Sequence, residues 1–146
     1  MPTMQEFWMK LKSLLSLARL AVNAQLSQLD LTSAAGDIIF HLVGKDAGLS
    51  QEELRERLNI GKAAISRTVD QLVRKGYAHR AKNPGDGRAC LVTLTEKGRG
   101  VSARVSEAYD HVFDIIKRDV PREDLLRVSL LLDLFQRNLT AERAAE

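Results

Sequence analysis

The sequence predicts a mainly helical protein with one small β-hairpin, an α+β fold. Three observations support this. Apolar residues recur at helical spacing near both ends of the chain, two short helical segments meet at residues 59–61, and two short strands flank residues 83–88. The 146 residues, 45% hydrophobic and 28% charged, have the composition of a globular domain. We therefore expect a single domain over residues 1–146.

Positive charge is concentrated in the middle of the chain. The net charge is only +3, but residues 61–88 contain seven Lys and Arg against two Asp, so this segment carries +5 and the remainder −2. A localised basic segment is typical of a surface that binds nucleic acid. A solvated Lys- and Arg-rich face would have the same composition, so the pattern of residues has to decide between the two.

Residues 50–76 predict two helices joined by a tight turn. Ser50 and Glu53 have the spacing of a capping box, and Leu54 and Leu58 give the first helix one apolar edge. The pattern breaks at residues 59–61 and resumes until Gly76, which suits a left-handed C-cap. Two short helices joined in this way form a helix-turn-helix. Other all-helical proteins also contain such pairs.

The second of these helices has an apolar face and a polar face suited to DNA. We expect burial of Ile65, Val69, Leu72 and Val73. The opposite side holds Ala63, Arg67, Asp70 and Arg74, with Ser66 and Gln71 on its flanks and Lys62 at its start. A small residue lets the backbone approach the major groove, while polar side chains reach bases and phosphates.

The hairpin follows the second helix directly. Residues 77–82 and 89–94 read as strands on either side of Asn83-Pro84-Gly85-Asp86-Gly87-Arg88, whose Pro and Gly favour a sharp turn. A helix-turn-helix followed by a hairpin is a winged helix. Arg88 at the tip would enter the minor groove, with Asp86 holding its guanidinium. This interpretation is favoured over a hairpin that only reverses the chain.

Residues 49–98 resemble the core of the MarR (multiple antibiotic resistance regulator) family of transcription factors. The matching motifs are Leu-x-x-x-Gly at residues 72–76, Asp-x-Arg at residues 86–88, and Leu-Thr-x-x-Gly at residues 94–98, in order and without a gap. The long flanking helices extend the resemblance to nearly the whole chain. One departure is Gly87, where many relatives have Arg, which predicts a weaker wing contact that Arg80 and Lys82 partly offset.

The resemblance implies a sequence-specific transcription regulator, a homodimeric repressor that binds a pseudo-palindromic operator in double-stranded DNA. A small aromatic or phenolic effector would bind between the dimer helices and the DNA lobe and release the protein; its pocket residues are not assigned. The alternative is a winged-helix module that binds another protein and no DNA. We expect DNA contacts from Ser50, Lys62, Ala63, Ser66, Arg67, Gln71, Arg74, Arg80, Lys82, Asn83, Asp86 and Arg88.

Both ends of the chain predict helices that a second copy covers. Eight of the eleven residues from Leu125 to Phe135 are apolar, more than the three or four per two turns that a surface helix needs. We expect residues 5–29 and 101–140 to form the dimer interface, and residues 32–98 the DNA-binding lobe. The alternative is that these helices pack only on their own domain. A dimer would place two reading helices about one turn of DNA apart.

The segment from Thr95 onward predicts a long helix that links the wing to the dimer interface, with Thr95 as its N-cap. Gly98 and Gly100 lie early in this helix. Glycine in a helix interior costs up to about 1 kcal/mol, so we expect both to weaken the helix and to allow bending.

Nothing in the sequence predicts catalysis, a cofactor or a metal site. His41, His79 and His111 are widely spaced, and Cys90 is the single cysteine. Strand alternation puts Cys90 on the same face as Val92 and Leu94, so we expect it in the core as a small hydrophobic residue. There is no long apolar run and no clear signal peptide, so we expect a cytoplasmic protein without a membrane span.

Overall fold

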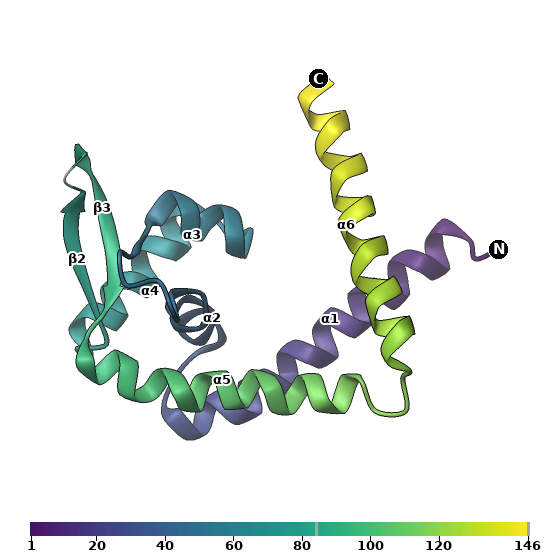
Figure 1. Ribbon diagram of the computed structural model, residues 1–146, viewed down its shortest axis with the longest axis horizontal. Helices are drawn as coiled ribbons and strands as arrows, with labels where there is room; N and C mark the ends of the chain where they lie inside the picture. The colour runs from purple at the N-terminus through teal and green to yellow at the C-terminus, as the bar shows by residue number, and fades with distance from the viewer. Residues whose placement is uncertain (84, 146) are drawn as a thin grey trace. The chain divides into compact units, whose positions relative to one another are not determined.

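The computed structural model describes residues 1–83 and 85–145, and gives only the backbone of residues 83 and 86–89 (Figure 1). It divides into two compact units, Met1–Val112 and the chain from Phe113 onward. The elements are α1 (Met4–Leu26), the 3-10 turn η1 (Ser27–Leu29), α2 (Ser33–Leu42), β1 (Leu49–Ser50), α3 (Gln51–Leu58), α4 (Lys62–Arg74), β2 (Ala78–Asn83), β3 (Asp86–Leu94), α5 (Glu96–Ile116) and α6 (Arg122–Ala145). The predicted fold class, mainly helical with a small antiparallel sheet, is confirmed.

One hydrophobic core holds the first unit together. It draws on α1, α2, both helices of the helix-turn-helix, the sheet and α5. The second helix of the pair, α4, which is the predicted reading helix, and the hairpin are therefore fixed on a common base. Its largest fully buried side chains are Leu26, Ile38, Ile39, Leu54, Ile65, Val69, Leu72, Val92 and Val105.

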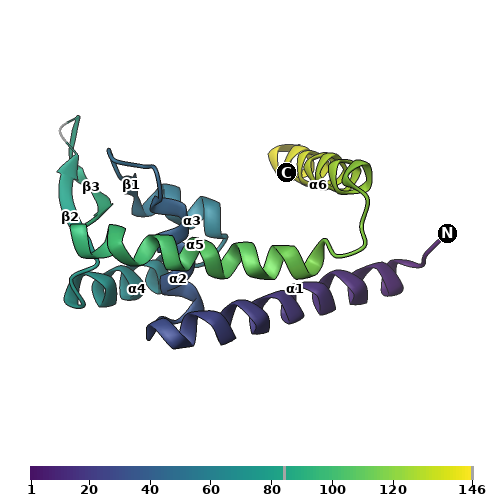
Figure 2. The ribbon, with the colours of Figure 1, turned by 60° about the horizontal axis from the view of Figure 1, so that its bottom comes forward.

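The sheet has three antiparallel strands in the order β1-β3-β2 (Figure 2). Strand β1 pairs Leu49 with Val92 and Ser50 with Leu91. This two-residue strand is not predicted from the sequence. The second strand of the hairpin begins at residue 86 rather than 89, and the pairing with β2 is irregular between Lys82 and Asn83. The hairpin is therefore longer than predicted, and Pro84 lies outside the described residues.

Local sequence signals set the ends of the helix-turn-helix pair. The Ser50 hydroxyl accepts the Glu53 N–H at 3.0 Å, and the C-cap residue of α3 is Asn59, with φ of 52°. At the end of α4, Gly76 has φ of 79°, and the Tyr77 N–H donates to the Leu72 carbonyl at 2.9 Å. With the Gly76 N–H on the Val73 carbonyl, this is the Schellman ending that a left-handed glycine permits.

One prediction for the buried face of α4 is wrong. Val73 is 38% exposed, whereas Thr68 is buried. At about 100° per residue, Thr68 lies about 60° from Ile65 around the helix and Val73 about 80° on the other side. The buried stripe is centred toward Thr68, whose hydroxyl donates to the Ala64 carbonyl at 2.9 Å and so enters the core satisfied.

The second unit contains α6, which has no buried residue along its described length. Its leucines and Val128 are mostly exposed, with Leu130 at 67%. Among the described residues, no helix is long and apolar enough to cross a membrane.

Candidate nucleic-acid interface

Six of the twelve predicted DNA-contacting residues lie on α4, along its exposed face. Lys62, Ala63, Arg67, Gln71 and Arg74 are exposed, and Ser66 is half-buried. The face is free of bulky apolar side chains except Val73 at its edge. An exposed helix face with small residues near its N-terminus and Arg farther along has the shape and charge to enter a major groove.

Arg80 on β2 lies against α4 instead of pointing away from the lobe. Its Nε donates to Gln51 Oε1 at 3.1 Å, its Nη1 to Asp70 Oδ1 at 2.5 Å, and its Nη2 to the Ser66 carbonyl at 3.3 Å. Its side chain is 29% exposed. The sequence predicts that this cation supplements the wing, but the structure gives its guanidinium three acceptors within the lobe.

Other predicted contact residues differ in how far the structure describes them. The Ser50 hydroxyl is engaged in capping α3. Lys82 is exposed. The side chains of Asn83, Asp86 and Arg88 lie outside the described part of the chain, so their predicted contacts remain predictions.

Gln51 also belongs to this region, although the sequence does not mark it as a site residue. It is the first residue of α3 and accepts the Arg80 N–H. The contact arises because β1, directly before Gln51, pairs with β3 and so brings the start of α3 near the hairpin. No local signal marks this, since a two-residue strand has no detectable period.

The base of the hairpin is joined to the start of α5. The Thr95 hydroxyl donates to the Gly76 carbonyl at 2.6 Å and accepts the Gly98 N–H at 2.9 Å. The Thr95 N–H donates to the Tyr77 carbonyl at 3.0 Å. Thr95 therefore caps α5, as predicted, and at the same time fixes the end of the reading helix.

The prediction that Cys90 lies in the core is wrong, because Cys90 is exposed. It does alternate with buried Val92 and Leu94 along β3. However, the pairing with β1 extends only to Leu91, so Cys90 lies beyond the part of β3 that pairs with β1, on the outer hairpin. Cys90 borders a cavity of about 270 Å³ that Ser50, Gln51, Glu52, Arg55, Lys62 and Ile65 also line.

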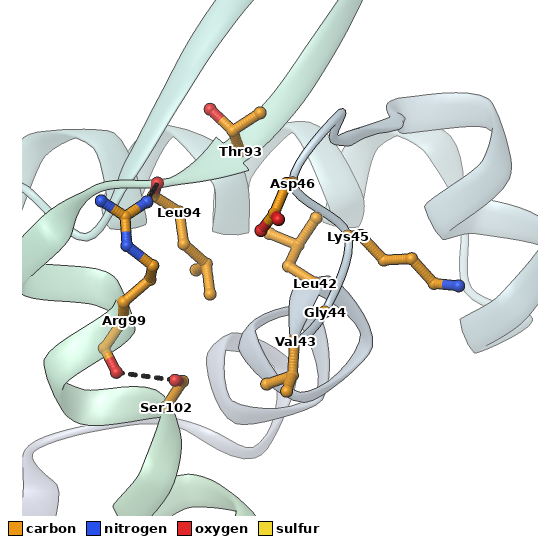
Figure 3. Close-up of a pocket in the computed structure, with 9 residues that line it drawn as sticks. All are labelled: Leu42, Val43, Gly44, Lys45, Asp46, Thr93, Leu94, Arg99 and Ser102. Carbon is orange, nitrogen blue, oxygen red and sulfur yellow. Dashed lines mark hydrogen bonds between the residues drawn. The ribbon is translucent and has the colours of Figure 1, made fainter.

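A larger cavity of about 560 Å³ lies between the end of α2, the loop that follows it, and the start of α5 (Figure 3). Leu42, Val43 and Leu94 supply apolar surface, and Arg99 and Asp46 supply charge. The Arg99 guanidinium donates to the Leu94 carbonyl at 3.1 Å, so the cation is held at the wall. This combination of apolar and charged surface can accept a small amphipathic molecule, and none of the residues that line the cavity is a predicted DNA contact.

A polar and aromatic cluster connects α1, α2 and α5. The Tyr109 hydroxyl donates to Asp37, and Phe40 stacks on the Tyr109 ring with centroids 4.4 Å apart. Arg19 lies 4.0 Å from the Asp37 carboxylate. Burial, with the hydrogen bond to Asp37, raises the pKa of Tyr109, so this hydroxyl stays protonated and remains a donor. Among the described residues, no group of His, Cys, Asp and Glu could hold a metal ion.

His41, beside this cluster, predicts a pH dependence of stability. Burial lowers its pKa below 6.5, Arg57 adds to the lowering, and Asp37 opposes it. The unfolded chain therefore binds the proton more readily than the folded protein does. The contribution of neutral His41 to the free energy of unfolding is thus fully present above pH 6.5, and it is lost as the pH falls through the lowered pKa. Urea unfolding at about pH 7.5 and about pH 5 should show a smaller loss for His41→Gln than for the wild type. His79→Gln, at an exposed position, is the control, and an equal loss in all three proteins would contradict the assignment.

Comparisons with known proteins place residues 29–89 in a match to the model of the MarR family. The multiple antibiotic resistance protein MarR of Escherichia coli is 35% identical over 80 residues, 55% of this chain and 55% of that protein. An uncharacterised HTH-type transcriptional regulator of Bacillus subtilis, YdgJ, is 43% identical over 51 residues, 35% of this chain and 31% of that protein. The matches thus span about half or less of these curated relatives.

Solved structures share the fold over most of the chain. A MarR protein from Peptoclostridium difficile has a TM-score of 0.83 at 19% identity, covering 93% of this chain and 88% of that one. CouR from Rhodococcus jostii, bound to p-coumaroyl-CoA, has a TM-score of 0.81 at 20% identity and covers 87% and 89%. A mutant of Escherichia coli MarR complexed with operator DNA has a TM-score of 0.73 at 22% identity and covers 92% and 99%.

Proposed function

Because this chain belongs to the MarR family of transcription regulators, we propose that it is a homodimeric repressor that binds an operator in double-stranded DNA. The observation that carries the proposal is the exposed face of α4, where Lys62, Arg67 and Arg74 accompany Ala63 in the region matched by the family model. In this proposal α4 enters the major groove, and the hairpin of β2 and β3 follows the adjacent minor groove.

Charge supports DNA as the partner. The +5 of residues 61–88 covers α4 and the hairpin, while the rest of the chain is slightly negative. Phosphate contacts by such a segment release condensed counterions and steer the protein to DNA. One solved structure that shares this fold, a mutant of Escherichia coli MarR, is a complex with operator DNA.

The exposed apolar side chains support a homodimer. Eight of eleven residues from Leu125 to Phe135 are apolar, and α6 buries none of them. Exposed apolar surface of this extent marks an interface. A two-fold pairing would cover α6 of both copies at once. The exposed apolar side chains of α1 and α6 include Met4, Trp8, Met9, Leu14, Leu15, Leu17, Leu20, Leu126, Val128, Leu130, Leu131, Leu132, Leu134 and Leu139.

A small aromatic or phenolic effector is the proposed release signal. CouR, which shares the fold, is bound to p-coumaroyl-CoA. An effector that binds one spacing of the two reading helices better than the other would shift the protein away from the DNA-bound state.

The test is the binding of the purified protein to DNA upstream of its own gene, titrated with salt and compared with unrelated DNA. Tight, salt-sensitive binding that prefers the upstream DNA would support the proposal. When a protein binds through phosphate contacts, the logarithm of its binding constant falls linearly with the logarithm of the salt concentration. An absence of binding to either DNA at low salt would reject it. If the protein nonetheless captures a protein partner with little salt dependence, the winged helix serves protein recognition.

Arg67→Ala should change the preference among operator sequences rather than weaken all of them equally. Arg67 is exposed at the middle of the reading face, where a guanidinium can make a bidentate bond to guanine worth about 1–3 kcal/mol. Binding to a library of operator variants measures this. Lys45→Ala, which removes one exposed charge outside α4, is the control. A uniform loss on every sequence would assign Arg67 to a phosphate instead.

A further inference from the structure

We propose that Arg80 is a positioning residue of the DNA-binding site, which fixes the angle of the hairpin relative to α4 and does not itself contact DNA. The inference rests on the proposed function. It concerns the three intramolecular bonds of one guanidinium, to Gln51, Asp70 and the Ser66 carbonyl.

The direction of the Arg80 side chain follows from the strand. Residues two apart on a strand share a face, so Arg80 lies on the same face of β2 as Ala78, which is 2% exposed. That face packs toward the core and α4. The guanidinium is therefore carried onto the reading helix, where the carboxylate of Asp70 and the carbonyl of Ser66 meet it.

The place of Arg80 along the hairpin gives the contact its leverage. The base of the hairpin is fixed by Thr95, through Gly76 and Tyr77. Arg80 is attached farther out, and the strand pairing becomes irregular beyond it, between Lys82 and Asn83. Loosening Arg80 would let the outer hairpin change its angle while the base stays in place.

The bonds hold position rather than supply much stability. The Arg80 and Asp70 side chains are 29% and 49% exposed, so solvent screens the ion pair. The planar guanidinium nevertheless bonds two elements in a fixed geometry, which the single ammonium of lysine cannot reproduce. Arg80→Lys therefore separates geometry from charge.

Two roles for Arg80 give opposite results in a mutant cycle. A positioning residue acts through its acceptor, so Arg80→Lys, Asp70→Ala and the double variant should all weaken DNA binding by about the same factor, roughly tenfold. None should reduce the salt slope by the unit expected for a lost phosphate contact. A phosphate-binding Arg80 would tolerate Lys, and loss of the Asp70 charge would leave binding equal or tighter.

The experiment measures affinity against salt for these variants, with Lys82→Ala as the matched control from the same face of β2. The control should lower the salt slope by about one. A nitroxide on Cys90, the single cysteine, lies opposite Lys82 on the outer hairpin and reports its motion without DNA. We expect a more mobile label in Arg80→Lys and Asp70→Ala, at an unchanged urea midpoint.

An unchanged label in both variants, or additive effects in the double variant, would overturn the proposal. A wild-type protein that binds no DNA would instead overturn the proposed function. The mobility of the label would still decide whether Arg80 holds the hairpin, because that measurement needs no DNA. The two failures are therefore distinguishable in one set of proteins.

Discussion

Gly98→Ala should lower the free energy of unfolding by about 3 kcal/mol or more, while Gly100→Ala should raise it by about 0.5–1 kcal/mol. A Cβ at residue 98 would lie 2.0 Å from the Tyr77 carbonyl oxygen and 3.2 Å from Leu94 Cδ2. Because backbone is the nearest obstacle, no side-chain rotation relieves the contact. A Cβ at residue 100 meets nothing within 4 Å, so alanine there gains helix propensity without a clash.

The expected damage from Gly98→Ala reaches the DNA-binding region. The Tyr77 carbonyl that the new Cβ would displace accepts the Thr95 N–H, and the Gly98 N–H is itself bonded to the Thr95 hydroxyl. The first bond joins the two ends of the hairpin, and the second caps α5 directly after it. Separation of these backbones would therefore loosen the hairpin as well as the core.

Urea unfolding followed by circular dichroism measures both variants, and the pair controls itself, since both add one methyl group to the same helix. Equal effects of the two substitutions would show that helix propensity, rather than the close approach at Tyr77, governs this segment. If Gly98→Ala is too unstable to purify, a strong fall in soluble yield beside normal Gly100→Ala gives the same ranking.

Features governed by local rules could be predicted from the sequence. The Ser50 cap, the left-handed Gly76 and the Thr95 cap each depend on residues within a few positions. The helix-turn-helix and the hairpin follow from periodicity and turn residues in the same way. The sequence also places Gly98 near the start of the long helix. It does not show why glycine is needed there, because the approach of the Tyr77 carbonyl depends on the fold.

Features that depend on contacts between distant segments could not be predicted. Cys90 has the right strand alternation for burial, but it lies beyond the residues of β3 that pair with β1, and the sequence does not show where that pairing ends. Arg80 reads as one more basic residue, and only the packing of β2 on α4 brings Ser66 and Asp70 to it. For the candidate site, the sequence therefore identifies the exposed cations but does not separate those free to meet DNA from those bonded within the lobe.

Leu131→Glu should convert the proposed dimer to a monomer, with a dissociation constant raised at least about a hundredfold. At about 100° per residue, Ser129, Asp133 and Gln136 share one narrow polar side of α6, and Leu131 lies roughly opposite. Leu131 is 48% exposed in the single chain, so a second copy is what would bury it. A carboxylate buried there would lose its water without gaining a partner.

Gln136→Glu introduces the same charge on the polar side of the same helix and should leave the dimer intact. Light scattering coupled to gel filtration, over a range of protein concentrations, measures both variants. Because a single reading helix contacts only half of a pseudo-palindrome, the Leu131→Glu monomer should also bind the operator far more weakly than the dimer does. A Leu131→Glu protein that remains dimeric would show that the copies meet through another surface, and a wild type that is monomeric at every concentration would reject the dimer itself.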